Sequence, residues 1–339
     1  MRDIYDVTII GGGAAGLYSA FYAGLRNMKT KIIEFQSQLG GKVQLFPEKT
    51  IWDIGGQPPI TGGAFIQQLI EQGMTFNPTV HLNTKVLEIT KNKEQLFEIE
   101  TNNGTHFSKT VIVAVGGGII NPQKLKVAGA EKVNLKNLHY VVREYEQFRG
   151  QTVLISGGGN TAIDWANELK DIAQSIHVVY RGDQLSAHES QVEYLQSHAN
   201  IHLNTSIEEV FADQATNAIT HTNLVNQLDE KYAVAVDHII VSHGFDMDQT
   251  IKYSFDQPLS RVDDFYIKTD AKLNTDIPGV FAAGDIASYD GKVNLLIGCF
   301  QDAANAVNRA KQFIEPEAEK VAMVSSHNNR VQKNYVLEK

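Results

Sequence analysis

Three glycines near the N-terminus, Gly11, Gly13 and Gly16, have the spacing that brings a polypeptide backbone close to a pyrophosphate. In such a pattern the first glycine permits a tight turn, the second permits close approach of the phosphates, and the third permits close packing of a helix on a strand. Glu34 follows near the distance at which a carboxylate accepts hydrogen bonds from the hydroxyls of an adenosine ribose. Because a carboxylate repels a 2′-phosphate there, these residues predict a site for a dinucleotide that lacks one.

The sequence around these glycines predicts a strand, a helix and a second strand. A β-branched run leads directly into the turn, an apolar helical pattern follows, and a second strand at residues 31–35 carries Glu34 at its end. A signal peptide or membrane span is the alternative, since residues 7–25 carry no charge. Asp3 and Asp6 in place of a basic flank, together with three clustered glycines, argue against it.

A second glycine turn, with the pattern Gly157-x-Gly159-x-x-Ala162, lies between a strand predicted at 152–156 and a helix predicted at 163–173. The candidate nucleotide contacts of this turn are Gly157, Gly159, Asn160 and Thr161. An apolar strand that ends in glycine follows each turn, at 110–115 and at 237–244. The repeated order indicates a duplicated nucleotide-binding architecture of the α/β class.

The residue after the second strand differs between the two copies. Where the first copy has Glu34, the second has Arg181, whose guanidinium can pair with a 2′-phosphate. The sequence therefore predicts FAD in the first site and NADPH in the second. A solvated surface charge is the alternative for Arg181, because Gly182 supplies no second basic residue.

Asp285 follows a strand predicted at 280–283, at the carboxyl end where open α/β sheets bind ligands. Its carboxylate could accept a hydrogen bond from a ribityl hydroxyl, or it could cap the N-terminus of a helix. A further helix is predicted at 301–313, and its dipole would stabilise negative charge on a reduced flavin. Helical spacing also predicts a helix at 61–74, and alternating short strands predict an antiparallel meander at 80–109.

The composition is that of an ordinary globular chain, with 339 residues, 42% hydrophobic and 20% charged, and its length suggests two domains. A net charge of −9 without any basic stretch argues against a nucleic-acid partner. The only cysteine, Cys299, permits neither an internal disulfide nor a Cys-x-x-Cys pair, which favours a reducing, cytoplasmic location. Its apolar surroundings, L-I-G-C-F, predict a buried and unreactive thiol.

Four motifs, I-I-G-G-G-A-A-G, L-G-G, G-G-G-N-T-A and N-T-D-I-P-G-V-F-A-A-G-D, resemble the two-dinucleotide-binding flavoprotein superfamily. The order of its parts is similar to thioredoxin reductase, but the missing Cys-x-x-Cys excludes dithiol chemistry. The chain more closely resembles the thioredoxin-reductase-like ferredoxin/flavodoxin–NADP reductases over nearly its full length. This resemblance rests on L-F-P-E-K, N-L-H-Y, G-G-G-N-T-A-I-D-W-A, A-H-E, S-H-G-F and a tail beyond Lys320 that contains S-S-H.

The resemblance implies two Rossmann-like three-layer domains, with the NADPH domain (119–245) inserted between two parts of the FAD domain (1–118 and 246–339). It implies one non-covalent FAD per chain, NADPH as co-substrate, and a homodimer without a membrane segment. The implied reaction moves electrons between NADPH and ferredoxin or flavodoxin by hydride transfer at flavin N5, so that no side chain acts as a catalyst and no metal is needed. The crossings at 117–122 and 244–248 are the predicted hinge between the domains.

The resemblance also assigns roles by motif position. Glu34 would meet the adenosine ribose, Lys42 and Phe46 the flavin end next to Gly41, Val86 the adenine through its backbone, Ile120 the domain junction, Asp285 the ribityl chain and Ser326 the isoalloxazine ring. The family often has Gln at position 42, Tyr at 46 and H-R-R where this chain has Y-R-G. Phe can stack as Tyr does, whereas the third departure leaves the strength of the NADPH preference open.

Two other functions share every cofactor motif. One is an NAD(P)H oxidase or diaphorase that reduces a small molecule, and the other is a flavin-based redox sensor without turnover. On composition alone, Phe46 would be assigned to the core rather than to a cofactor.

Overall fold

The computed structural model describes residues 2–132, 135–248, 251–323 and 327–328. It divides into two compact units: an outer unit, Met1–Ile120 with Met247–Lys339, and an inserted unit, Asn121–Asp246. The divisions fall within about two residues of the predicted boundaries. Both units are built on a parallel sheet, as the α/β prediction requires.

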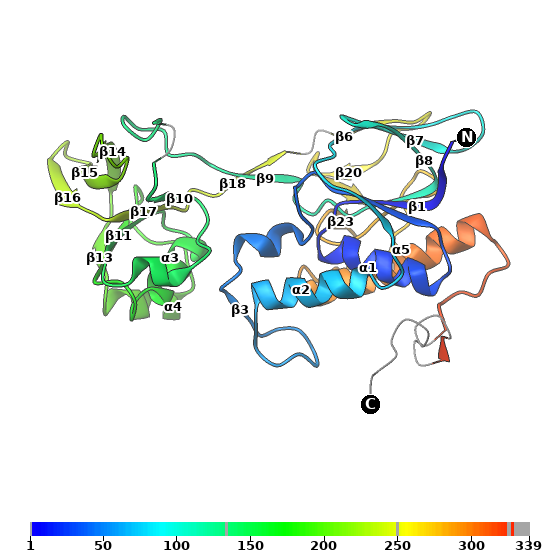
Figure 1. The fold of residues 1–339 in the computed structure, drawn as a ribbon, viewed down its shortest axis with the longest axis horizontal. Coiled ribbons are helices and arrows are strands. Elements are labelled where there is room, and N and C mark those ends of the chain that lie inside the picture. The colour runs from blue at the N-terminus through cyan, green and yellow to red at the C-terminus, as the bar shows by residue number, and fades with distance from the viewer. Residues whose placement is uncertain (1, 133–134, 249–250, 324–326, 329–339) are drawn as a thin grey trace. The chain divides into compact units, whose positions relative to one another are not determined.

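A parallel sheet forms the centre of the outer unit. Strand β1 (Ile4–Ile10) pairs with β2 (Thr30–Ile33) on one side and with β8 (Gly104–Val113) on the other. The edges are β5 (Thr79–His81) beside β2 and β22 (Val280–Ala282) beside β8. The helices α1 (Ala14–Leu25), α2 (Gly62–Gly73) and α5 (Leu296–Ile314) lie along one face of these strands (Figure 1).

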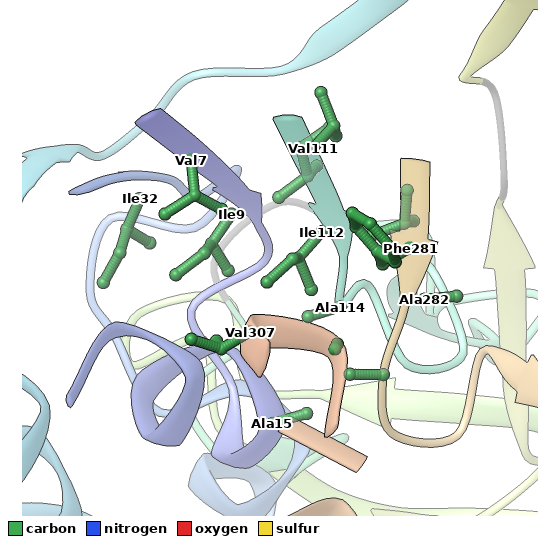
Figure 2. Close-up of a cluster of buried hydrophobic side chains, with 14 of the residues drawn as sticks. Val7, Ile9, Ala15, Ile32, Val111, Ile112, Ala114, Phe281, Ala282 and Val307 are labelled. Atoms are coloured by element: carbon green, nitrogen blue, oxygen red, sulfur yellow. The ribbon is translucent and has the colours of Figure 1, made fainter. Parts of the chain in front are cut away.

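Apolar side chains between this sheet and its helices form the core of the outer unit (Figure 2). Ile9 of β1 and Ile112 of β8 are fully buried, and Phe281 of β22 and Val307 of α5 pack with them. The continuous apolar runs in these strands therefore reflect strands that are covered on both faces.

The predicted meander and the predicted strand at 110–115 are not separate elements. Strand β6 (Val86–Lys91) pairs antiparallel with β7 (Phe97–Thr101), which pairs with the first half of β8, while the second half of β8 joins the parallel sheet. The smaller elements of this unit are η1 (Gly41–Leu45), β3 (Thr50–Ile51), β4 (Ile60–Thr61), β19 (Lys252–Ser254), β20 (Arg261–Val262), β21 (Tyr266–Lys268) and β23 (Ala287–Ser288).

The inserted unit has a parallel sheet in the order β10-β17-β11-β12-β13 and a three-stranded antiparallel sheet, β14-β15-β16. The bounds of its elements are β10 (Leu138–His139), η2 (Tyr145–Phe148), β11 (Thr152–Ser156), α3 (Asn160–Glu168), β12 (Ser175–Val179), α4 (Glu189–Gln196), β13 (Asn200–His202), β14 (Thr205–Ala212), β15 (Ile219–Asn226), β16 (Lys231–Ala235) and β17 (His238–Val241). Leu154, Leu224 and Ile239 are fully buried in a core shared by both sheets.

Three predicted helix bounds are wrong, the first being the start of α3, which lies at Asn160 rather than at 163. Helix α3 ends at Glu168 rather than at 173, because the chain turns there so that the Gln174 N–H can donate to the Gln151 carbonyl at 2.9 Å. Helix α5 begins at Leu296 rather than at 301, since the apolar residues before Gln301 continue its buried face. The two crossings between the units, β9 (Ile119–Pro122) and β18 (Phe245–Asp248), pair as a two-stranded sheet.

A histidine pair links two neighbouring strands of the inserted unit. His139 Nε2 of β10 lies 2.9 Å from His238 Nδ1 of β17, and the Phe148 ring packs edge-on against both imidazoles. Burial, reinforced by the neighbouring His238, lowers the pKa of His139 to about 4. Burial also lowers the pKa of His238, against the opposing charge of Asp237.

We expect this pair to make the protein less stable in acid. A histidine whose folded-state pKa lies below its unfolded value stabilises the fold fully above pH 6.5, and this stability is lost as the pH falls toward 4. Between pH 7.5 and 5 the free energy of unfolding should fall by on the order of 2 kcal/mol. Denaturant unfolding at the two pH values should show a smaller loss in His139→Gln than in the wild type. The exposed His188, replaced by Gln, serves as the control and should leave the pH dependence unchanged.

Candidate functional site

The first glycine turn connects β1 to α1. Gly11 has a φ of 104°, a conformation that favours glycine, and the helix begins at Ala14. Gly13 precedes the helix with extended backbone, and no side chain caps the first-turn N–H groups. These donors, at the positive end of the helix dipole, suit a phosphate.

The three glycines of this turn differ in what a side chain would contact. A Cβ on Gly11 would lie 2.4 Å from the Ala114 carbonyl oxygen, and one on Gly16 would lie 1.9 Å from the Gly11 carbonyl oxygen. A Cβ on Gly13 would meet nothing nearer than the Gly41 Cα, at 3.5 Å, which is an ordinary contact. The fold itself therefore requires Gly11 and Gly16, whereas the open side of Gly13 fits a pyrophosphate that approaches the backbone.

Glu34 lies against this turn. The residue is 7% exposed, with Oε2 accepting the Gly12 N–H at 2.6 Å and Oε1 accepting the Gln36 N–H at 2.7 Å. Each carboxylate oxygen keeps a lone pair that can accept a hydroxyl proton. The Thr84 N–H donates to the Glu34 backbone carbonyl at 2.9 Å, which ties Glu34 to the segment that leads into β6 and its buried first residue, Val86.

The loop before η1 is held against the glycine turn. The Gly40 N–H donates to the Gly12 carbonyl at 2.8 Å, and a Cβ on Gly41 would lie 2.7 Å from the Gly13 Cα. This close approach places η1, with the exposed Lys42 and the half-buried Phe46 at its end, beside the turn. The predicted contacts 41, 42 and 46 are therefore gathered on one side of the candidate site.

Asp285 is exposed at the carboxyl end of β22. Because the next helix begins at Leu296, the alternative that Asp285 caps a helix is wrong. A Cβ on the preceding Gly284 would lie 2.8 Å from the Ala15 Cβ in the first turn of α1. Asp285 therefore follows a turn that packs directly on the helix end that would receive the phosphates.

A buried ionic network behind this turn was missed in the sequence. Asp302 of α5 is fully buried and accepts hydrogen bonds from the Gly284 N–H at 3.0 Å, the Tyr289 hydroxyl at 2.6 Å and the Lys292 ammonium at 2.5 Å. The Lys292 side chain is only 6% exposed. Burial and the bond to Asp302 raise the pKa of the Tyr289 hydroxyl. An acidic residue within the apolar stripe of a helix was the signal that could have revealed it.

Cys299 is buried beside this network, as predicted. Burial, and after it the negative charge of Asp285, raises the pKa of the Cys299 thiol to about 12. The thiol is therefore protonated at neutral pH and a poor nucleophile.

In the second glycine turn, as in the first, the first glycine is crowded and the middle glycine is open. A Cβ on Gly157, whose φ is 152°, would lie 2.4 Å from the Ser242 carbonyl oxygen, whereas a Cβ on Gly159 would meet nothing within 4 Å. Helix α3 begins at the exposed Asn160 with no side-chain cap on its first N–H groups, and the half-buried Thr161 follows. The same open position at the helix N-terminus thus occurs in the inserted unit.

Arg181 is exposed immediately after Tyr180, beyond the end of β12. Burial and the positive charge of Arg181 lower the pKa of His243, which bonds Ser156 at the end of β11, so Arg181 lies near the second glycine turn. A Cβ on Gly158 or on Gly182 would lie 2.4 or 2.5 Å from the Tyr180 ring. A side chain at position 182 would therefore require the Tyr180 ring to move.

Two predicted site residues cannot be placed against the others. Ile120 belongs to β9, and its side chain lies outside the description, as does the whole of Ser326. The described tail lies at the C-terminal end of α1, where Arg26 donates to the Glu319 carbonyl at 2.6 Å and Asn328 donates to the Leu25 carbonyl at 3.2 Å. A helix of 12 residues separates that end from the glycine turn by about 18 Å.

Within the described ranges, no group of three or more His, Cys, Asp or Glu side chains could hold a metal ion. No described helix is both long and apolar enough to cross a membrane.

Known proteins resemble the chain over almost its whole length. The family described as "Pyridine nucleotide-disulphide oxidoreductase" matches residues 5–310. Ferredoxin–NADP reductase 2 of Exiguobacterium sibiricum is 55% identical over 330 residues, which cover 96% of this chain and 94% of the relative. Ferredoxin–NADP reductase 3 of Lysinibacillus sphaericus is 54% identical over 333 residues, covering 97% and 95%.

Solved structures show the same fold. Lactococcus lactis thioredoxin reductase has a TM-score of 0.72 at 27% identity and covers 91% of this chain and 99% of its own. T. acidophilum thioredoxin reductase has a TM-score of 0.74 at 22% identity, with coverage of 91% and 98%, and supports the fold alone. The predicted fold and family are confirmed: the chain is an oxidoreductase of the pyridine nucleotide-disulphide oxidoreductase family and belongs to its ferredoxin–NADP reductases.

Proposed function

We propose that the chain carries one non-covalent FAD per protomer and moves electrons between NADPH and ferredoxin or flavodoxin. The reaction converts two reduced ferredoxins, NADP⁺ and a proton into two oxidised ferredoxins and NADPH. The observation that carries the proposal is the open middle glycine, Gly13 or Gly159, at an uncapped helix N-terminus in each unit. Two such turns fit two dinucleotides, one in each unit.

The outer unit supplies the residues that would hold FAD. The N–H groups of α1 would bind the pyrophosphate, Glu34 the adenosine ribose and Asp285 the ribityl chain. The backbone of Val86 would face the adenine, and Lys42 and Phe46 the flavin. FAD, when bound, accepts two electrons from NADPH and releases them singly, so the protein need only orient both partners and exclude water. The one cysteine, with its raised pKa, leaves no protein dithiol to relay electrons.

A homodimer and a cytoplasmic location complete the proposal. The described tail residue Asn328 lies at the far end of the chain's own α1, which is consistent with a tail that reaches a partner's flavin with Ser326. The lone cysteine supports a reducing location. Sedimentation, and oxygen uptake after truncation beyond Lys320, would test the dimer and the tail separately.

The decisive experiment measures NADPH-driven reduction of purified ferredoxin and flavodoxin, with oxygen uptake recorded in parallel. Turnover with either protein carrier supports the proposal. Reduction of oxygen or quinones alone would instead identify an oxidase or diaphorase, and a flavin that NADPH does not bleach would indicate a redox sensor.

Arg181→Gln should weaken NADPH selectively. A charge-assisted contact to the 2′-phosphate is worth about 1.5–3 kcal/mol, so the KM for NADPH should rise about ten- to a hundredfold while that for NADH stays nearly constant. Arg149→Gln removes the same charge from an exposed residue before the opposite end of β11 and should change neither constant. Equal losses with both nucleotides would mean that Arg181 supports the fold instead.

A further inference from the structure

A cationic segment of the inserted unit takes no part in the proposed nucleotide sites. Its lysines, Lys124, Lys126, Lys132 and Lys136, are all exposed, and in the described part of the chain none of them forms an ion pair. Six other described lysines are paired with carboxylates, among them Lys109, Lys231 and Lys252. Residues 124–140 hold these four lysines and one carboxylate, Glu131, so they concentrate positive charge in a chain of net charge −9. We call residues 124–132 and 135–140 the lysine segment.

The backbone of the lysine segment is fixed on the antiparallel sheet. The Val210 N–H of β14 donates to the Ala128 carbonyl at 2.9 Å. A Cβ on Gly129, whose φ is 84°, would lie 1.9 Å from the Val210 carbonyl oxygen, so the backbone of the lysine segment is in direct contact with the backbone of β14. The Leu125 N–H donates to the Tyr140 hydroxyl at 3.2 Å, and the Lys124 ammonium lies 4.0 Å from the Tyr140 ring. The lysines therefore project from an anchored surface.

A hollow of about 870 Å³ opens within this segment. Apolar side chains, including Leu125, Leu138 and Tyr140, form part of its wall, while Lys124, Lys126 and Lys132 supply positive charge. Glu131 is the acidic residue among those lining the hollow. Neither the second glycine turn nor Arg181 contributes to it, so this surface is separate from the candidate NADPH site. A partly apolar hollow whose lining includes three lysines and one glutamate suits a protein partner that is acidic around an apolar contact.

We propose that the lysine segment is the docking surface for ferredoxin; this inference rests on the proposed function. Four cysteine thiolates and the inorganic sulfides give an iron–sulfur cluster net negative charge, so the carrier is negative around its redox centre. The net charge of −9 would otherwise repel such a partner. Unpaired lysines can steer the acidic carrier onto one site, and a small contact of this kind suits a partner that must leave after each electron.

The test compares two double variants with equal changes in net charge. Lys124→Glu with Lys126→Glu reverses the lysine segment, whereas Lys268→Glu with Lys272→Glu reverses exposed lysines of the outer unit. The first should lower kcat/KM for ferredoxin by about tenfold or more at low ionic strength and flatten its salt dependence. NADPH-driven reduction of a neutral quinone should stay at the wild-type rate in both, which verifies folding and both cofactor sites.

The outcomes separate this inference from the function on which it rests. Unchanged ferredoxin kinetics in the first variant, or equal losses in both variants, would overturn the docking surface while leaving the reductase activity in place. A wild-type protein that reduces quinone but no ferredoxin would overturn both. Should the reversal lower quinone turnover, Lys124→Gln with Lys126→Gln gives the same comparison with a milder change, and must still lower kcat/KM for ferredoxin alone.

Discussion

Gly13→Ala is expected to give a folded protein without FAD, whereas Gly16→Ala is expected not to fold. The added methyl of Gly13→Ala would make an ordinary 3.5 Å contact with Gly41, and the φ of −80° at this position suits alanine. The methyl would, however, occupy the space that a pyrophosphate needs. A Cβ at position 16 would lie 1.9 Å from the Gly11 carbonyl oxygen and would force α1 off the sheet.

The measurement combines visible absorbance, for flavin content, with far-ultraviolet circular dichroism, for folding. Gly13→Ala should lower FAD affinity at least about a hundredfold, equivalent to about 2.7 kcal/mol. Gly159→Ala is the matched control, because it makes the equivalent change in the inserted unit, where no atom lies within 4 Å of the new Cβ. It should keep full FAD occupancy and raise the KM for NADPH. Full flavin content in Gly13→Ala would refute the assignment of the first turn.

Sequence patterns predicted the features that depend on neighbouring residues. The turn between β1 and α1 is defined by local glycine spacing, and an apolar run before it suffices to place the strand. The buried state of Cys299 likewise followed from its apolar neighbours. Glu34 could be placed beside the turn because it follows a strand expected to run parallel to the first, so that both strands end at the same edge of the sheet. The cofactor roles of these residues remain predictions.

Features that depend on distant packing could not be predicted. No local pattern shows that the meander and the central sheet share the strand β8, because each half of it has its own neighbours. Gly182 lacks the second cation of the family pattern, and only the structure shows that the Tyr180 ring crowds this position. Unpaired lysines can be distinguished from paired ones only when the positions of all carboxylates are known.

The ionic network around Asp302 also depends on residues that are distant in the sequence. Its removal should greatly lower the free energy of unfolding and weaken FAD binding. Asp302→Ala leaves the Lys292 ammonium, 6% exposed, without its carboxylate, and a buried unpaired charge costs about 3–5 kcal/mol. It also leaves the Gly284 N–H without its acceptor, which should loosen the turn that carries Asp285. Denaturant unfolding should therefore shift strongly, and FAD should dissociate more readily.

Two further variants distinguish the effect of the buried charge on stability from the effect of the Gly284 turn on FAD binding. Glu315→Ala breaks an ion pair between Lys311 and the exposed Glu315 carboxylate at the end of the same helix and should cost less than about 1 kcal/mol. Asp302→Leu combined with Lys292→Met removes both buried charges and should recover much of the lost stability, because an apolar pair has no desolvation penalty. FAD affinity should stay low in that double variant, since the Gly284 N–H still lacks its acceptor. Wild-type FAD affinity there would show that Asp302 stabilises the fold without positioning the turn that precedes Asp285.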